Sequence, residues 1–409
     1  MPFAFGFAVL LAFLPACAVP QRGPGAANSP QAADSAVSPS AFTFQVIAKS
    51  GDTIDGHELD STGPIWDLSD HGEVIMDATL KNEAARNESF SAVMTASPSA
   101  KRLLAYQGQM IGQDRVLAIA GTRAINRKGQ ALYEVTVRGP ECQSGCNHLY
   151  LDGAPIATRL PGSGLMLSDL GTIAGLAKVG PERFSFLSAL DRSKLDAPVT
   201  NIWDSTHSAF FEPGTDRILE VSTVWGKSPG DPVAYRLSSS QGKVCDTDFQ
   251  QQPLDLKGGV FAKTIPASFG WTAGDRRPIP PVTVHGKVVK PDSIYDAHWD
   301  ARCELALLRI LTDVVVPEKR GQAADEVSAT YSIYTKAGLL LSAKATINVA
   351  QYAIPYHSIP LAGFRDVYVP TETFVMNNFG QVAFSAHIDR LSGIDAQRMA
   401  IILATPKPH

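Results

Sequence analysis

The sequence predicts an all-β protein, a six-bladed β-propeller-like closed repeat in which each blade is a four-stranded sheet. A strand–turn–strand pattern recurs along the chain, and a second pair of strand-like segments follows each copy. In the clearest copy, residues 374–386, two apolar segments flank Asn377, Asn378 and Gly380. Asn tolerates left-handed backbone geometry and Gly adopts it without steric cost, so a tight hairpin is expected here.

The same hairpin pattern recurs at residues 68–75, 125–132 and 167–174, with weaker copies at 211–219 and 297–306. Three segments that begin with glycine precede a turn glycine at similar spacing; the pairs are Gly51 and Gly72, Gly108 and Gly129, and Gly153 and Gly171. A register that repeats in this way is typical of a repeat architecture.

A second pair of strands is predicted after each hairpin, at residues 91–105, 148–157, 184–202, 233–245, 329–343 and 399–404. The last of these has room for one strand only, and residues 44–48, ahead of the first hairpin, can supply the other. A four-stranded blade has two apolar faces that it cannot bury alone, and a closed ring buries both. The sequence therefore predicts that the N-terminal strand completes the last blade.

Three regions are expected along the chain. Residues 1–17 read as a signal peptide, because their apolar run is short for a membrane span and ends in small residues. Residues 18–41 have the Ala, Pro, Ser and Gly composition of a disordered tether. Residues 42–409 form the propeller, with insertions near 250–291 and 348–370. The alternative is a β-repeat array followed by a C-terminal β-sandwich.

The segment 14–17 resembles the lipobox of bacterial lipoproteins, in which the cysteine becomes the lipidated first residue. Cys17 is the expected lipidation site, and the expected localisation is the bacterial cell envelope, with membrane contact through a lipid anchor only. Cleavage after Ala18 is the alternative, which gives a periplasmic or secreted soluble protein.

The four remaining cysteines form an even set, which suits an oxidising compartment. We expect Cys142 to pair with Cys146 and Cys245 with Cys303. The first two cysteines could instead bind zinc, but His148 is the only further ligand nearby. No metal site is therefore expected.

Residues 47–56 together with residues 68–75 resemble a family of uncharacterised bacterial secreted repeat proteins. The units of that family run "A-x-x-G-D-T-I-x-G … I-N-x-x-G-x-V-x-F", and the resemblance covers about half of this chain. It implies an exported, propeller-like body. Since the family has no agreed activity, the resemblance implies no catalytic residue.

Several function classes are disfavoured by the composition. The net charge of -4 and the absence of an aromatic-interleaved basic stretch argue against nucleic acid as a partner. No phosphate-binding loop or nucleophile elbow occurs, so no cofactor is expected. The turn residues Asp70, Asn126, Asp169 and Asn377 supply too few oxygen ligands for calcium. These observations favour a non-enzymatic scaffold that binds a glycan, a peptide or a partner protein.

The alternative function is an extracellular propeller-fold hydrolase or lyase acting on carbohydrate. Its candidate catalytic residues are Asp296, His298 and Asp300, because a histidine between two aspartates has the groups needed for acid–base chemistry. The competing interpretation of this segment is an irregular blade turn with a structural histidine.

A ligand of the propeller is expected where the chain enters the innermost strands, around one mouth of the central channel. The expected ligand-binding residues are aromatic or polar and occupy this place in five of the six repeats: Trp66, Arg123, His207, Tyr295 and Glu372.

Overall fold

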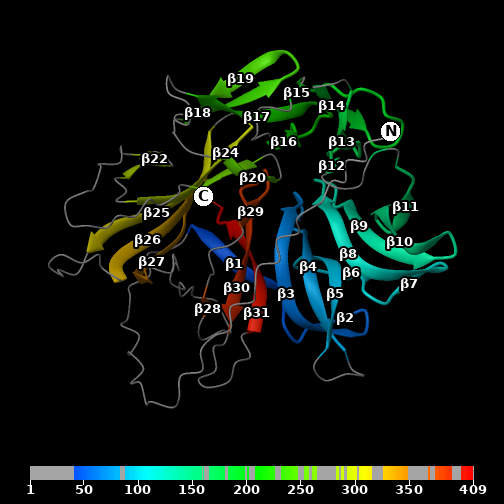
Figure 1. Cartoon of the computed structure of the whole chain (residues 1–409). Helices are drawn as coiled ribbons and strands as arrows, with labels where there is room; N and C mark the ends of the chain where they lie inside the picture. Colours follow the sequence, from blue (N-terminus) through cyan, green and yellow to red (C-terminus); the bar gives the residue numbers. More distant parts are fainter. Residues whose placement is uncertain are drawn as a thin grey trace, which may run out of the picture. The chain divides into compact units, whose positions relative to one another are not determined.

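The computed structural model is all-β throughout the residues that it describes. These are residues 41–82, 88–158, 160, 165–179, 183–198, 200–201, 208–225, 232–246, 253–257, 260–264, 282–284, 287–289, 293–301, 304–315, 326–348, 367–368, 374–388 and 398–408. Six sheets are the blades of a six-bladed β-propeller, which confirms the predicted fold (Figure 1). The described residues include no helix that is long and apolar enough to cross a membrane.

Blades 1 and 2 are five-stranded sheets with the same plan. Blade 1 consists of β2 (Thr53–Ile54), β3 (His57–Leu68), β4 (Val74–Lys81), β5 (Ser89–Ala96) and β6 (Lys101–Tyr106). Blade 2 consists of β7 (Met110–Ile111), β8 (Asp114–Ile125), β9 (Ala131–Gly139), β10 (Cys142–Leu151) and β11 (Ala154–Ile156). In both blades a two-residue strand pairs with the start of a long inner strand, β3 or β8.

Blades 3 and 4 have four strands each, in sequence order. Blade 3 consists of β12 (Met166–Leu167), β13 (Ile173–Lys178), β14 (Arg183–Ser188) and β15 (Thr200–Asn201). Blade 4 consists of β16 (Ser208–Phe211), β17 (Ile218–Trp225), β18 (Pro232–Ser239) and β19 (Gly242–Asp246).

Blade 5 contains the four expected strands and a further hairpin. Its expected strands are β24 (Ser293–Asp300), β25 (Leu305–Val315), β26 (Glu326–Thr335) and β27 (Gly338–Asn348). The segment expected to be an insertion supplies β20 (Pro253–Lys257) and β21 (Val260–Thr264), which extend the sheet beyond β24, and a separate hairpin of β22 (Val282–Val284) and β23 (Lys287–Val289). This segment therefore adds strands to a blade.

Blade 6 joins the two ends of the propeller. Its strands are β1 (Phe42–Lys49), β31 (Arg398–Pro406), β30 (Val382–Ile388), β29 (Phe374–Met376) and the short β28 (Val367–Tyr368). β1 pairs antiparallel with β31, with Phe44 opposite Ala404, as the sequence predicts. The alternative of a separate C-terminal sandwich is wrong, because the strands after residue 250 complete the ring of blades.

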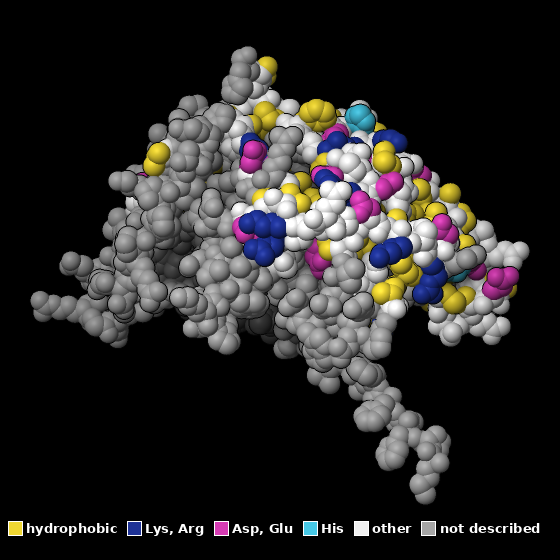
Figure 2. All heavy atoms as spheres, turned by 90° about the horizontal axis from the view of Figure 1, so that it is seen from above, with side chains coloured by type: hydrophobic (Ala, Val, Ile, Leu, Met, Phe, Trp, Pro, Cys, Tyr) yellow, Lys and Arg dark blue, Asp and Glu magenta, His cyan; other side chains and the backbone are white. Residues whose placement is uncertain are grey.

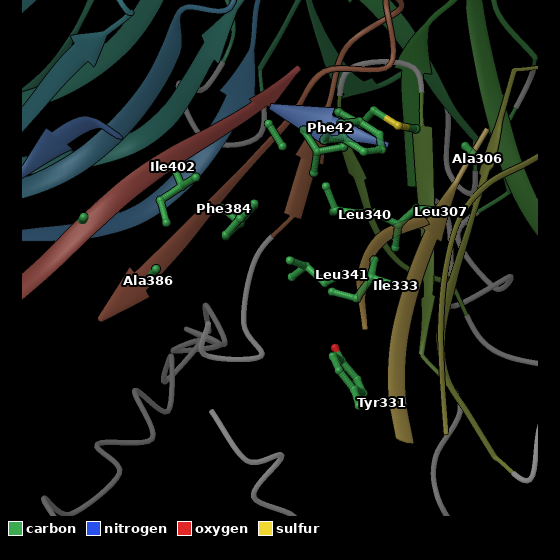
Figure 3. Close-up of a cluster of buried hydrophobic side chains, with 14 of the residues drawn as sticks. Phe42, Ala306, Leu307, Tyr331, Ile333, Leu340, Leu341, Phe384, Ala386 and Ile402 are labelled. Atoms are coloured by element: carbon green, nitrogen blue, oxygen red, sulfur yellow. The ribbon is translucent and has the colours of Figure 1, made fainter. Parts of the chain in front are cut away.

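The hydrophobic core lies between consecutive blades. In Figure 3, side chains of blade 6 such as Phe384 and Ile402 face Leu341 and Tyr331 of blade 5, and Phe42 of β1 joins this buried cluster. Similar clusters combine residues of blades 6 and 1, 1 and 2, 2 and 3, and 3 and 4. At these five junctions, neighbouring sheets thus bury apolar faces against each other, which favours a closed ring.

A pair of stacked tyrosines on neighbouring strands of blade 2 lies at the junction with blade 1. The Tyr133 and Tyr150 rings are 5.4 Å apart between centroids, and the Tyr133 hydroxyl donates a 3.2 Å hydrogen bond to the Leu104 carbonyl of blade 1. Burial, followed by the nearby Tyr150, raises the pKa of Tyr133 to about 12. The neutral phenol is therefore the form that this junction accommodates.

The disulfide Cys142–Cys146 is present, with a Cα–Cα distance of 5.8 Å, as predicted. It closes an irregularity in β10, where Gly145 has a φ of 98°. Cys245 lies in β19, whereas Cys303 lies outside the described residues, so their pairing stays a prediction. Cys17, the signal peptide and nearly all of the tether also lie outside them.

Candidate functional site

We call the turns that follow β3, β8, β12, β16, β24 and β29 the inner turns, and those of blades 1, 2, 3 and 6 share one hydrogen-bonding plan. In blade 6, Asn377 Oδ1 accepts hydrogen bonds from the backbone N–H groups of Phe379 and Gln381, both at 3.1 Å. Gly380 has a φ of 73°, in the left-handed region that its lack of a side chain allows. Ser69, Asn126 and Ser168 accept equivalent bonds in blades 1, 2 and 3.

The first residues of the inner turns also bond to the next blade. Asn377 Nδ2 donates to the Ser69 carbonyl at 2.8 Å, and Asn126 Nδ2 donates to the Ser168 carbonyl at 3.2 Å. The Ser168 hydroxyl donates to Asp216 of blade 4 at 2.5 Å. The side chains of Asn377, Asn126 and Ser168 thus each shape their own turn and also hold the inner turn of the next blade in place.

The second residues of the inner turns form a charged chain around the axis. Asp70 accepts a 3.0 Å hydrogen bond from Asn378 Nδ2, and Asp169 accepts hydrogen bonds from the N–H groups of Arg127 and Gly214. Arg127 Nε lies 2.8 Å from Asp169 Oδ2 and 3.3 Å from Asp70 Oδ2. The guanidinium of blade 2 therefore balances carboxylates of blades 1 and 3.

An axial cavity of about 330 Å³ lies inside this chain of contacts. Its walls come from the ends of the inner strands β3, β8, β12 and β16, and from the blade 6 inner turn. Both Trp66 and Arg123 line it. They lie near the C-terminal ends of β3 and β8, three residues before the first residue of each inner turn.

The Arg123 guanidinium stacks over the Trp66 ring at 4.9 Å from its centroid. Arg123 Nε donates to Asp77 Oδ1 at 2.7 Å, and Nη1 donates to the Gly121 carbonyl at 2.6 Å. The bulge in β8 between Ala120 and Arg123 makes this carbonyl contact possible. Two residues at the same place in consecutive blades therefore form one wall of the cavity.

A second, mouth cavity of about 800 Å³ lies between the inner turns of blades 4, 5 and 6. Asp300 lines it and forms an ion pair with Lys336, which also lies 2.7 Å from Glu304. Phe379, with 69% of its surface exposed, lies at the tip of the blade 6 turn on the same cavity.

Charged and hydrophobic side chains are mixed on one face of the described part of the protein. On the face shown in Figure 2, Lys and Arg side chains lie among Asp, Glu and hydrophobic side chains. Within the described residues, no group of three or more His, Cys, Asp or Glu side chains is arranged to hold a metal ion.

Of the predicted ligand-binding residues, Trp66 and Arg123 come together in the axial cavity. His207 and Glu372 lie outside the described residues. Tyr295, Asp296 and His298 are in β24, where the structure describes only their backbone. Of the candidate catalytic residues, only the side chain of Asp300 can be placed, so the hydrolase or lyase alternative stays a prediction.

Sequence reasoning missed the role of Arg127. It interprets Asp70 and Asp169 as turn residues only, whereas the structure puts the Arg127 guanidinium between them. The signal was the order of charge at the second turn position, acidic in blades 1 and 3 and basic in blade 2.

No protein-family model matches the chain, and a search of curated proteins found no similar sequence. Among solved structures, the chain is similar to an acylaminoacyl peptidase from Pyrococcus horikoshii, with 8% identity, 83% of this chain and 52% of that chain covered, and a TM-score of 0.34. The chain thus spans about half the length of that peptidase.

It is also similar to a substituted levansucrase from B. megaterium, with 9% identity, 93% and 91% coverage, and a TM-score of 0.26. At these TM-scores, neither similarity carries a conclusion about the activity of this chain. The protein is a six-bladed β-propeller whose described inner turns surround an axial cavity and a mouth cavity.

Proposed function

We propose that the protein is a cell-envelope binding scaffold whose axial cavity takes a neutral sugar residue of a glycan. The observation that carries the proposal is the stacked Trp66–Arg123 wall beside the Arg127 guanidinium in a cavity of about 330 Å³. Volumes of about 300–1,000 Å³ are usual for small-molecule sites.

The charges of the cavity favour a neutral ligand. Its lining includes three carboxylates, Asp67, Asp70 and Asp169, and two guanidinium groups, Arg123 and Arg127. The carboxylates outnumber the guanidinium groups, so the lining would repel an anionic ligand. A cationic ligand would meet carboxylates that already accept hydrogen bonds from neighbouring N–H groups.

The hydrogen-bonding groups that remain suit sugar hydroxyls. Arg127 is held through its Nε, and its two terminal nitrogens donate no hydrogen bond within the described part of the chain. The Asn378 side chain is exposed at the cavity edge. Hydroxyl groups can accept from the guanidinium, while C–H groups of a sugar ring can pack on the part of the Trp66 side chain that lines the cavity and is not covered by Arg123.

The test is a glycan array followed by calorimetry with each glycan that binds. Trp66→Ala should weaken binding at least about tenfold, because it removes the aromatic wall of the cavity. Met110→Ala is the matched control, since Met110 is 58% exposed and lines neither cavity. Equal affinity of the Trp66→Ala variant and the control would overturn the proposed site, provided that both variants unfold at the same temperature.

The proposal extends to the location of the protein. A lipid on Cys17, followed by the tether at residues 18–41, would hold the propeller at the bacterial cell envelope. Mass spectrometry of the mature N-terminus tests this part separately. A chain that begins at Val19 would instead support simple secretion.

A further inference from the structure

The axial and mouth cavities adjoin each other. Four residues line both of them: Arg127, Pro213, Asn377 and Asn378. A ligand seated in the axial cavity therefore meets the mouth cavity directly beyond the blade 6 inner turn.

The two volumes suit successive parts of a chain-like ligand. The axial cavity, at about 330 Å³, is near the lower end of the usual range for small-molecule sites, whereas the mouth cavity is about 800 Å³. A saccharide with its end in the axial cavity can continue only through an opening large enough for further sugar residues, and the mouth cavity provides one.

Phe379 gives the mouth cavity an aromatic surface. Its ring is 69% exposed, while its backbone is fixed by the hydrogen bond from its N–H to Asn377 Oδ1 and by the left-handed Gly380. Polar groups lie around it, among them Asn378, Thr215 and the Lys336 ammonium. An exposed aromatic ring beside such groups is the arrangement that binds the C–H face of a sugar together with its hydroxyls.

We propose that the two cavities form one continuous site for a linear oligosaccharide, in which Phe379 stacks on a sugar residue outside the axial cavity. The inference rests on the proposed function and adds the length of the ligand to it. Asn378, which lines both cavities, contacts the sugars on either side of the junction.

Leu170 provides a matched control for Phe379. Both residues occupy the third position of an inner turn, in blades 3 and 6, and Leu170 is 57% exposed. Leu170 does not line either cavity. Truncating it therefore removes a similar exposed apolar side chain without touching the proposed site.

The experiment is calorimetric titration of the full chain with cellulose-, starch- and chitin-derived oligosaccharides and with the corresponding monosaccharides. For the glycan type that binds, the oligosaccharide should bind at least about tenfold more tightly than its monosaccharide. Phe379→Ala should abolish this gain and leave monosaccharide affinity unchanged. Phe379→Trp should retain the gain, and Leu170→Ala should behave as the unchanged protein.

Affinity that does not depend on ligand length would overturn the inference while leaving the proposed function in place. The same holds for an equal loss of monosaccharide and oligosaccharide affinity in Phe379→Ala. A protein that binds none of these saccharides would overturn the proposed function, and this inference with it.

Discussion

Asn377 and Ser69 join the last blade to the first, across 308 positions of the chain, through a 2.8 Å hydrogen bond from Asn377 Nδ2 to the Ser69 carbonyl. The other end of the same amide accepts the two N–H groups that shape its own turn. Closure of the propeller therefore uses a side-chain contact at the axis as well as the pairing of β1 with β31.

Two substitutions at Asn377 separate these roles. Asn377→Ser keeps an oxygen that can accept from the turn, as Ser69 does in blade 1, but it removes the amide Nδ2 that donates to the Ser69 carbonyl. We expect it to lower the free energy of unfolding by about 1 kcal/mol, and Asn377→Ala by about 2–3 kcal/mol, since the alanine also leaves the turn N–H groups unpaired. Urea unfolding measures both, and equal losses in the two variants would contradict the dual role.

Removing the Arg127 guanidinium should leave the carboxylates of Asp70 and Asp169 facing each other without a cation. Arg127→Met is expected to lower the free energy of unfolding by about 1–3 kcal/mol at low ionic strength, and added salt should recover part of the loss by screening the repulsion. A second substitution, Asp169→Asn, should also recover part of it. A loss that neither salt nor the second substitution changes would show that packing, and not charge, is what Arg127 contributes.

Alkaline conditions should weaken the junction between blades 1 and 2. The folded-state pKa of Tyr133 is raised from 10.0 to about 12, so the phenol loses its proton more easily in the unfolded chain. Its contribution to stability is complete below the unfolded value and is lost as the pH rises from about 10 to about 12.

The measurement is urea unfolding at a series of pH values, with the near-ultraviolet absorbance of tyrosinate as the titration signal. Tyr133→Phe should be less stable at neutral pH by about 1 kcal/mol, because it loses the hydrogen bond to Leu104. It should also lose less stability than the unchanged protein as the pH rises. If Tyr133→Phe loses as much stability at alkaline pH as the unchanged protein does, Tyr133 is not the cause of that loss.

Gly121 should not tolerate a side chain. Its φ is 61°, and a Cβ there would lie 1.5 Å from Glu134 Oε2, the oxygen that accepts the Thr122 N–H. Gly121→Ala should cost about 3 kcal/mol or more of unfolding free energy and weaken saccharide binding, because the bulge that positions Arg123 would have to shift.

Gly153→Ala is the matched control for this prediction. Gly153 has a φ of 85°, but nothing lies within 4 Å of the added Cβ, so only backbone strain of about 1 kcal/mol applies. The comparison uses chemical unfolding of both variants. Similar costs at the two positions would mean that Glu134 moves aside without penalty.

The fold could be predicted because its repeated feature is local. A Ser or Asn at the first position and a Gly at the fourth determine an inner turn without reference to the rest of the chain. The spacing of the glycines was less informative. Gly51 and Gly108 precede the short strands that lead into β3 and β8, whereas Gly153, treated as their equivalent, lies in the turn between β10 and β11. The similar spacing of Gly153 and Gly171 therefore did not indicate an equivalent hairpin.

The candidate site was less predictable for a physical reason. Trp66 and Arg123 could be selected as polar or aromatic residues near the axis, but β3 and β8 begin at His57 and Asp114, and their bulges interrupt the alternating pattern that would reveal such long strands. The position of Arg127 between two aspartates depends on three blades packing together, so the order of charge at the second turn position is informative only once the register of these blades is known.

The pairing of β1 with β31 has a consequence for folding in time. The ribosome makes β1 before any other strand of the propeller, yet the hydrogen-bonding partner of β1 is synthesised last. Until then its edge is unpaired, and unpaired edges are the surfaces through which chains aggregate. Contacts between such distant segments form slowly, so we expect the two ends to meet late in folding. A chain stalled before residue 398 would hold five completed sheets and an open sixth, with the edge of β1 exposed to other chains.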